Sequence, residues 1–459
     1  MIPCPNWHDR LAHLIHPYPA KLLVHIPFFF LNNDLLSEAG DLVLDPFCGS
    51  GTVLSEAQSA GRVGYGADAN PLARLIARVK TTQIEPPRIR QHLRSIITKI
   101  KDENPRNLPD VVNINHWFYP NVVSQLQCLR QVILRIRDAR TREFLLVCFS
   151  VTVRKVSRAD PRLSVPVRLR LGQYPKLHPL RAKSDSHLRK LRKVSVVKVF
   201  ESVVRSNLLR MKRLRKADVN EPCMVIGSDA RNLKSESGGD WGTVECVADE
   251  SIQLIITSPP YPGAQKYIRA SSLSLGWLGL CASSDLRRLK GQSIGREEVS
   301  KVECLENGST GIAAADRAIT NIRRRNRKRA AIATAYLNEM RTALGEMRRV
   351  LKTGGHLVLV AANNRICGRS FKTVEYLSAI CEDLGFFTTA CFVDAIHSRG
   401  LMTKRNKTAS LIARECVLVL TKGGLPKWCQ QKVISWPKSR RSMKKYGSVA
   451  LPSQRCRLG

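Results

Sequence analysis

The stretch LDPFCGSGT, residues 44–52, contains the end of a short apolar strand, a glycine-rich turn and the start of a helix. Gly49 and Gly51 let the backbone pass close to a ligand because they carry no Cβ atom. The helix that follows presents unpaired N–H groups in its first turn. In doubly wound α/β sheets, ligands bind at the carboxyl ends of the strands, where this turn would lie. Taken alone, the stretch fits either a nucleotide site or a plain tight turn.

The residues around this turn predict a repeating strand–helix pattern. A strand is expected at 41–44, a helix at 52–60, a second strand at 62–67 and a second helix opened by Pro71. Proline is tolerated in the first turn of a helix, where its missing N–H would be unpaired anyway. This order is typical of a parallel sheet with helices on its faces. Asp68 follows the second strand, where a carboxylate can accept hydrogen bonds from both hydroxyls of a ribose.

The sheet pattern stops after this region and resumes much later. Residues 85–220 instead read as helices, at 88–103, 121–138, 141–158 and 185–216. Strands are expected again at 224–229, 252–257, 356–362, 388–396 and 415–421, with helices at 330–351 and 372–384. We therefore divide the chain into a first half-domain, a basic helical insertion, a second half-domain and a basic flexible tail, at 1–84, 85–220, 221–425 and 426–459.

The charge of the chain points to a polyanionic partner. Its 75 Lys and Arg residues against 37 Asp and Glu residues give a formal net charge of +38. Nucleic acid is the first partner to consider, because phosphates neutralised by Lys and Arg release counterions on binding. The run Arg323, Arg324, Arg325, Arg327, Lys328 and Arg329 is expected to contact phosphate. The alternative is a solvated helix start.

Other classes of protein are disfavoured. The 14 cysteines form no CxxC pair, so neither a zinc ribbon nor a thioredoxin-like motif is supported. Cysteines scattered in this way favour a reducing cytoplasm. The beginning of the chain lacks the pattern of a signal peptide, and the apolar run at 26–31 is too short to span a membrane. The spacing of His8, His13, His16 and His25 fits no common metal site, so no metal is expected.

A second stretch, IITSPPY at residues 255–261, also follows a strand and should lie at the same edge of the sheet. Pro259 and Pro260 fix the backbone and have no N–H to donate, so nearby carbonyl oxygens point outward as acceptors. Together with the Ser258 hydroxyl, they suit an amino group that bears two protons. Tyr261 offers a flat face for stacking a base. The alternative is a rigid corner with a surface tyrosine.

The order Phe-x-Gly-x-Gly and then Ser-Pro-Pro-Tyr, each at a strand end, resembles the amino-methylating DNA methyltransferases. The resemblance implies a doubly wound, mostly parallel Rossmann-like α/β sheet with a basic, largely helical insertion. It covers roughly 1–84 and 222–425. It implies that S-adenosyl-L-methionine binds at the first motif, with Asp45, Pro46, Phe47, Gly49, Gly51 and Asp68, and that Ser258, Pro259, Pro260 and Tyr261 form the catalytic loop.

Three further segments extend the resemblance. HPYPAK at 16–21 looks like the segment that closes over the methionine end of the cofactor, which brings in Tyr18 and Lys21. GSDA at 227–230 is similar to the third-strand acid that meets the adenine ring, here Asp229. Residues 366–369 are similar to the loop that helps to hold the target base. The segment that reads the target sequence is either the insertion at 85–220 or the segment at 280–330.

The resemblance also implies a chemistry. Hydrogen bonds from a base amino group to Ser258 and to the Pro259 carbonyl would localise the nitrogen lone pair, and the base must be flipped out of the duplex to reach them. A Ser-headed loop is commoner in cytosine-N4 enzymes and an Asp-headed loop in adenine-N6 enzymes, so cytosine N4 is favoured. Carbon-5 methylation is disfavoured because Cys223, in a Pro-Cys pair, lacks the expected Gln after it.

The implied partners are double-stranded DNA and the cognate endonuclease of a restriction–modification system. Three alternative functions stay open at this point. The first is adenine-N6 methylation of DNA. The second is guanine-N2 methylation of tRNA, whose enzymes share the fold and a Pro-Pro-Tyr-like loop. The third is a DNA-binding protein with an inactive methylase fold.

Overall fold

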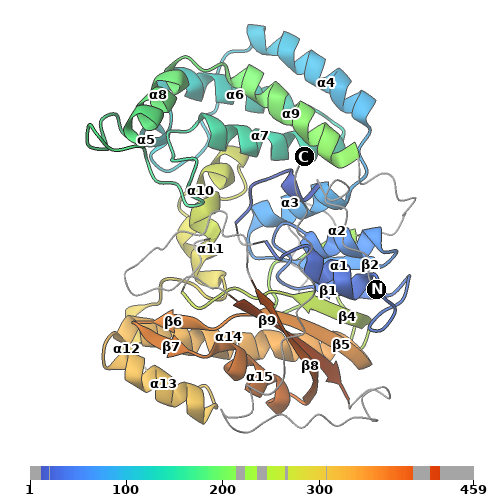
Figure 1. Ribbon diagram of the computed structural model, residues 1–459. Helices are drawn as coiled ribbons and strands as arrows, with labels where there is room; N and C mark the ends of the chain where they lie inside the picture. The colour runs from blue at the N-terminus through green and yellow to red at the C-terminus, as the bar shows by residue number, and fades with distance from the viewer. Residues whose placement is uncertain are drawn as a thin grey trace. The chain divides into compact units, whose positions relative to one another are not determined.

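A seven-stranded sheet forms the centre of the computed structural model, in the order β3-β2-β1-β4-β5-β9-β8 (Figure 1). The first five strands of this order are parallel, and β9 runs antiparallel to both of its neighbours, β5 and β8. The mostly parallel sheet expected from the sequence is therefore confirmed. In chain order the strands are β1 Leu42–Asp45, β2 Val63–Ala67, β3 Cys223–Gly227, β4 Ile252–Thr257, β5 Leu351–Ala361, β8 Phe386–Ala395 and β9 Arg414–Lys422. The structure describes residues 12–19, 21–212, 223–234, 246–263, 267–305, 308–395 and 414–423.

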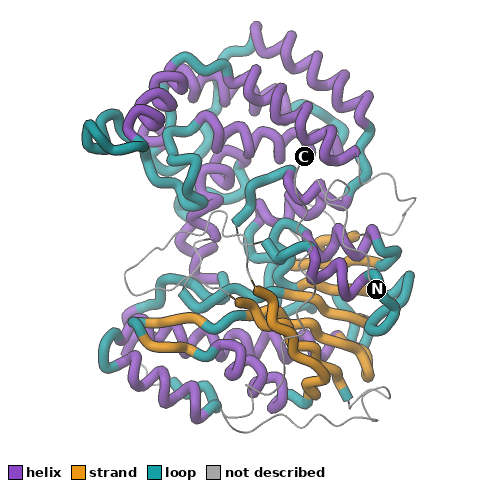
Figure 2. The backbone as a smooth tube through the Cα atoms, in the orientation of Figure 1, coloured by secondary structure: helices purple, strands orange, loops and turns teal. Residues whose placement is uncertain are grey.

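Helices cover both faces of the sheet because its side chains alternate between them (Figure 2). Val43, Leu254 and Val358 pack in one cluster with residues of α1 (His25–Leu31) and α2 (Thr52–Ser59). Their chain neighbours Leu44, Ile255 and Leu357 point to the opposite face, into a cluster with α13, α14 and α15. Both faces are therefore apolar, as is usual in parallel sheets. These last helices are α13 Ala313–Arg323, α14 Arg327–Val350 and α15 Thr373–Asp383.

The insertion is helical and basic, as expected. Its elements are α4 Pro86–Lys99, the 3₁₀ helix η2 Ile100–Asp102, α5 Ile114–Trp117, α6 Pro120–Leu134, α7 Ala139–Val156, α8 Arg181–Arg192 and α9 Val196–Lys212. The periodicity at 185–216 corresponds to two helices rather than one, because the chain leaves helical geometry after Arg192 and restarts at Val196.

The insertion shares one hydrophobic core with the cofactor half of the sheet domain. That core joins residues of α6, α7 and α9 to α3 (Pro71–Thr81), to α10 (Tyr267–Leu278) and to Ile15 and Tyr18 of the N-terminal segment. The Trp277 side chain of α10 is fully buried there, with its ring 5.6 Å from that of Phe118. The insertion is therefore anchored to the helix that follows the Ser258–Tyr261 loop.

The remaining elements lie after α10. They are α11 Leu286–Gln292, α12 Lys301–Leu305 and a small antiparallel hairpin of β6 Asn364–Ile366 and β7 Arg369–Phe371. Within the described part of the chain, no helix is long and apolar enough to cross a membrane. The flexible tail expected at 426–459 lies outside the described residues, and so does His8.

Candidate active site

The glycine-rich turn connects β1 to α2 at the carboxyl edge of the sheet. Gly49 and Gly51 both adopt positive φ angles, 50° and 70°, which favour glycine. A Cβ atom on Gly51 would lie 2.8 Å from the Cβ of Ala77 in α3, so this position also lets two helices approach closely. The Ser50 hydroxyl in this turn is buried and has no hydrogen-bond partner among the described residues.

Asp68 lies at the end of β2, against the same turn. Its Oδ2 accepts a hydrogen bond of 2.9 Å from the Gly49 N–H, and its Oδ1 accepts one of 2.7 Å from the Asn70 N–H. Burial raises the pKa of this carboxyl, while the two N–H donors oppose the rise. The turn and the carboxylate expected from the sequence are therefore brought together and held in a fixed geometry.

Tyr18 and Lys21 come from the N-terminal segment. The Tyr18 side chain is only 6% exposed, and its hydroxyl accepts a hydrogen bond of 3.1 Å from the Asn70 side-chain amide. The Tyr18 ring lies against Gly49, 3.7 Å from where a Cβ would stand. The Lys21 ammonium donates to the carbonyls of His13 and His16, each at 2.6 Å. Lys21 therefore stabilises the segment that carries Tyr18. Burial, and to a smaller extent the charge of Arg210, lowers the pKa of Lys21 to about 8.

Asp45 connects the turn to the Ser258–Tyr261 loop. It ends β1, is 3% exposed, and its Oδ1 accepts a hydrogen bond of 2.7 Å from the Thr257 hydroxyl at the end of β4. The Phe47 N–H donates to the same oxygen at 3.1 Å. Burial raises the pKa of Asp45 to about 7, and both hydrogen bonds oppose the rise. The carboxyl ends of two neighbouring strands are therefore linked by one buried side-chain contact.

The Ser258–Tyr261 loop leaves β4 immediately after Thr257. Ser258 is half-buried, and its hydroxyl has no hydrogen-bond partner among the described residues. The Tyr261 ring is 7% exposed, and its hydroxyl donates to Glu415 Oε1 at 3.0 Å. Gly295 backs the loop so closely that a Cβ there would stand 2.7 Å from the Tyr261 carbonyl oxygen.

The buried Tyr261 ring differs from the open stacking face expected from the sequence. The ring packs inward because its hydroxyl finds a partner on β9, a strand that follows it in the chain by more than 150 residues. Burial raises the pKa of Tyr261 well above its ordinary value, so the hydroxyl remains a donor. The Tyr261 hydroxyl is therefore engaged by Glu415, whereas the Ser258 hydroxyl is bonded to no other described residue.

Asp229 lies beyond β3, next to the end of β2. The neighbouring strand ends are joined by a hydrogen bond of 3.3 Å from the Asp68 N–H to the Gly227 carbonyl. Asp229 itself is half-exposed and pairs with Arg231, whose Nη2 approaches Oδ2 to 2.8 Å. The Arg231 guanidinium also donates to the Gln292 carbonyl at 2.8 Å. The third-strand acid is therefore at the expected sheet edge, already paired with a cation.

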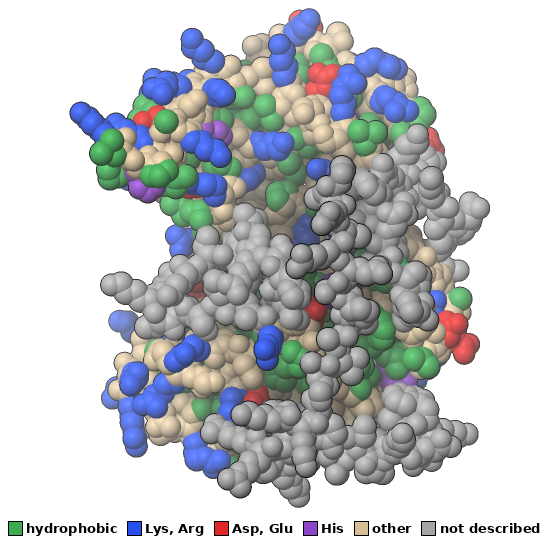
Figure 3. Space-filling view, in the orientation of Figure 1, with side chains coloured by type: hydrophobic (Ala, Val, Ile, Leu, Met, Phe, Trp, Pro, Cys, Tyr) green, Lys and Arg blue, Asp and Glu red, His purple; other side chains and the backbone are tan. Residues whose placement is uncertain are grey.

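The basic run 323–329 spans the end of α13 and the start of α14. Arg329 donates at 3.4 Å to the carbonyl of Gly263, which lies just after the Ser258–Tyr261 loop in the chain. Arg325 donates at 3.3 Å to the Cys367 carbonyl. Cys367 lies in the turn between β6 and β7, the loop expected to help hold the base. Arg324, Arg327 and Lys328 are exposed. Lys and Arg side chains gather at this lower-left end of the molecule and over the helical insertion (Figure 3).

Several residues of the site were not expected from the sequence. Asn70 bridges the cofactor side to α10, because its side-chain amide donates to Tyr18 and, at 2.9 Å, to Ser271. A second bridge runs from His16 to Ser150 of α7 at 2.9 Å, and from Ser150 to Ser274 of α10 at 2.8 Å. Only Asn70 carries a sequence signal, because an Asn before Pro71 is a typical helix cap.

Each of the three described histidines of the N-terminal region has its own side-chain partner. His13 pairs with Glu56, His16 with Ser150 and His25 with Asp394. Within the described ranges, there is no group of three or more His, Cys, Asp or Glu side chains that could hold a metal ion.

Comparisons with known proteins match the part of the chain that contains the glycine-rich turn. A family model described as DNA methylase matches residues 19–78, which include the glycine-rich turn and Asp68. The chain is 25% identical over 425 residues to the type II methyltransferase M.MvaI of Kocuria varians, and this match covers 87% of each protein. It is 35% identical over 99 residues to the type II methyltransferase M.MjaII of Methanocaldococcus jannaschii, covering 22% of this chain and 18% of that one.

A solved structure is also similar in part. A DNA modification methylase from Thermus thermophilus, complexed with S-adenosyl-L-methionine, is 17% identical over 39% of this chain and 51% of that one, with a TM-score of 0.20.

Proposed function

Because the chain belongs to the amino-methylating DNA methyltransferases, we propose that it transfers a methyl group from S-adenosyl-L-methionine to an exocyclic amino group of a base in double-stranded DNA, cytosine N4 being the favoured acceptor. The observation that carries the proposal is the hydrogen bond between Asp45 and Thr257. It ties the strand that ends in the glycine-rich turn to the strand that ends in the Ser258–Tyr261 loop. A cofactor at the first and a base at the second would therefore meet at one edge of the sheet.

The residues of the turn fit the cofactor. Gly49 and Gly51 leave two positions of the turn without a side chain, and Asp68 is held ready to accept ribose hydroxyls. The buried Ser50 hydroxyl has no partner among the described residues. Tyr18 closes the turn from the N-terminal side. When bound, S-adenosyl-L-methionine supplies an electrophilic methyl group on its sulfonium sulfur.

The catalytic loop positions the acceptor. The Ser258 hydroxyl and the Pro259 carbonyl accept hydrogen bonds from the two protons of an amino group, which localises the nitrogen lone pair toward the methyl group. Alignment of two reacting groups is worth as much as ~7–11 kcal/mol, and fixed acceptors add electrostatic stabilisation. The base must leave the stack to reach this loop. No covalent bond between enzyme and base is required.

The choice of cytosine N4 rests on Ser258. An Asp at this position is commoner in the adenine-N6 members of the family, and here a neutral hydroxyl takes its place. The proposal extends to a restriction–modification setting with a cognate endonuclease, because both curated relatives carry the name type II methyltransferase. A cytoplasmic location fits the cysteines, since those in the described part of the chain form no disulfide bond.

The test is methyl transfer from radiolabelled S-adenosyl-L-methionine to unmethylated duplex DNA and, in parallel, to unmodified tRNA. The proposal predicts label in DNA alone. Label in tRNA without label in DNA would support a guanine-N2 tRNA enzyme instead. Cofactor binding with no transfer to either nucleic acid would support an inactive methylase fold.

A further inference from the structure

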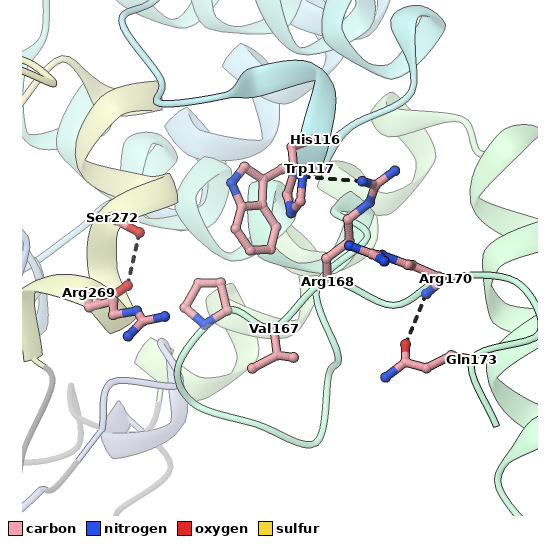
Figure 4. Close-up of a pocket in the computed structure, with 9 residues that line it drawn as sticks. His116, Trp117, Val167, Arg168, Arg170, Gln173, Arg269 and Ser272 are labelled. Carbon is pink, nitrogen blue, oxygen red and sulfur yellow. Dashed lines mark hydrogen bonds between the residues drawn. The ribbon is translucent and has the colours of Figure 1, made fainter.

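A pocket of about 530 Å³ lies between the helical insertion and α10, outside the site described above. Its walls come from α5, from the loop at 166–173 and from the first turns of α10 (Figure 4). A volume of this size is within the range of small-molecule sites in proteins, about 300–1,000 Å³.

The pocket is positively charged. Arg168, Arg170 and Arg269 line it, and none of the described residues in its lining is Asp or Glu. Among the described residues, these three arginines form no ion pair, and the Nε of Arg168 is buried without a hydrogen-bond partner. The surrounding charge acts on His116 as well, because burial and then Arg168, Arg158 and Arg170 lower its pKa. Guanidinium groups that form no ion pair with another described residue are suited to bind an anion, and a phosphate in particular.

The pocket also has an aromatic wall. The half-buried Trp117 indole lies at its back, with the His116 ring packed against it edge-on at 4.8 Å (Figure 4). The indole belongs to the chain segment that packs on the large core of the insertion. An indole face beside arginines is the combination that binds bases of single-stranded nucleic acid by stacking.

The walls are fixed in place before any ligand binds. The Arg158 N–H donates to the Trp117 carbonyl at 2.7 Å, and the Leu169 N–H donates to the Arg158 carbonyl at 2.8 Å. Arg168 Nη1 contacts His116 Nδ1 at 3.2 Å. These bonds hold α5 and the 166–173 loop together as one support.

The other wall connects the pocket to the catalytic loop. Arg269 and Ser272 lie on α10, which begins shortly after Tyr261 and is held by Asn70 through Ser271. A DNA strand that places its target base at Ser258 would therefore pass close to this part of α10.

We propose that this pocket binds one nucleotide of the DNA strand beside the target base, with its phosphate at Arg168 and Arg269 and its base against Trp117. The inference rests on the proposed function, because it takes DNA as the substrate. It gives the helical insertion a direct role in holding that substrate. It assigns no sequence preference to the pocket, because phosphate contacts and stacking tolerate any base.

The first experiment measures the affinity of the full-length protein for a short duplex of arbitrary sequence over a series of salt concentrations. The Arg168→Ala and Arg269→Ala variants should each lose one phosphate contact. The negative slope of log affinity against log salt should therefore become shallower by about 0.9. Arg94→Ala is the matched control, because Arg94 is an exposed arginine on α4, a helix that contributes none of the residues found to line the pocket. Its slope should be that of the wild type.

The second experiment concerns stacking, which requires that the base beside the target also leaves the duplex. Trp117→Ala should raise the KM for DNA in methyl transfer by about ten-fold, with a smaller effect on kcat, whereas Trp117→Phe should retain most of the affinity. Circular dichroism of each variant verifies that it is folded. If folded Arg168→Ala and Trp117→Ala variants keep wild-type slope and KM, the pocket proposal is wrong. An effect of Arg94→Ala equal to that of Arg168→Ala would also overturn it.

These outcomes are separate from a failure of the proposed function. If the wild-type protein methylates no DNA, the function is wrong whatever the variants do. If it methylates DNA and the pocket variants match it, only the pocket assignment is wrong.

Discussion

The Thr257 hydroxyl donates a 2.7 Å hydrogen bond to Asp45, and neither side chain is more than 3% exposed. The two residues end neighbouring parallel strands, β4 and β1. The strand β1 leads into the glycine-rich turn, and β4 leads into the Ser258–Tyr261 loop. The distance between cofactor and acceptor in the proposed reaction therefore depends on this contact.

The Thr257→Val variant tests the contact through stability. It removes the donor to a buried carboxyl, which costs about 1–3 kcal/mol. Burial raises the pKa of Asp45 from its ordinary value of 3.8 to about 7, so the free energy of unfolding falls as pH rises from about 4 to about 7 and levels off above that value. Without the Thr257 donor the pKa rises further, and the stability deficit of the variant should grow with pH.

Urea unfolding on either side of pH 7 measures this deficit. Thr257→Ser keeps the hydroxyl and is the control, for which the deficit should be small and independent of pH. A deficit in Thr257→Val that is the same at low and high pH would show that its hydroxyl does not act on the Asp45 carboxyl.

The Asp68→Asn variant tests the cofactor site. The amide keeps the size of the side chain and removes the charge that Gly49 and Asn70 hold in place. Hydrogen bonds to a charged group are worth about 1.5–3 kcal/mol, so affinity for S-adenosyl-L-methionine should fall by roughly 10- to 100-fold. Calorimetric titration measures the affinity, and an unchanged value would remove Asp68 from the site.

The Ser258→Ala variant separates chemistry from cofactor binding. The hydroxyl is expected to act on the acceptor amino group alone, so kcat should fall while the affinity for S-adenosyl-L-methionine stays within about two-fold of the wild type. Loss of one well-placed electrostatic contact in other enzymes costs about 10²–10³ in kcat. Single-turnover kinetics at saturating cofactor give the rate of the chemical step. A wild-type rate would assign the chemistry to other groups of the loop.

His16 gives a prediction for acidic pH. Burial, with smaller contributions from Lys21 and Lys80, lowers its pKa from 6.5 to about 3. Below pH 6.5 the His16 imidazole binds a proton in the unfolded chain but stays neutral in the folded one. The free energy of unfolding therefore decreases as pH falls from 6.5 toward 3. The slope from one such group is at most about 1.4 kcal/mol per pH unit.

The His16→Gln variant should unfold with a free energy that falls less steeply below pH 6.5 than that of the wild type. Ser150→Ala is the control, since it removes the hydrogen-bond partner of His16 and leaves the buried imidazole. Its slope should remain close to that of the wild type. Equal slopes in all three proteins would mean that His16 does not titrate differently on unfolding.

The local pattern around the two motifs was enough to predict much of this structure. Each motif lies at a strand end, and the strand expected at 252–257 has those bounds as β4. The helix expected at 330–351 begins three residues earlier because Asn326 caps it, accepting a hydrogen bond from the Arg329 N–H. Apolar runs and caps are local, so the sequence reports them directly.

Contacts between distant segments could not be predicted in this way. Glu415 accepts the hydrogen bond from the Tyr261 hydroxyl but lies far along the chain, and no local pattern links the two residues. The helix α10 contains three serines and a glycine, which lower its helical propensity, and it is stabilised because Trp277 and its neighbours are buried against the insertion. The pocket at Trp117 likewise exists only once α5, the 166–173 loop and α10 are packed together.

Methyl transfer to the cytosine amino group is best tested by the mass of the nucleosides released from duplex DNA that the purified protein has methylated. We expect the methyl group in N4-methyl-2′-deoxycytidine. Label in N6-methyl-2′-deoxyadenosine would keep the mechanism and overturn the assignment that rests on Ser258. Label in 5-methyl-2′-deoxycytidine would contradict the account, because carbon-5 transfer requires a covalent enzyme nucleophile and not the acceptors of this loop.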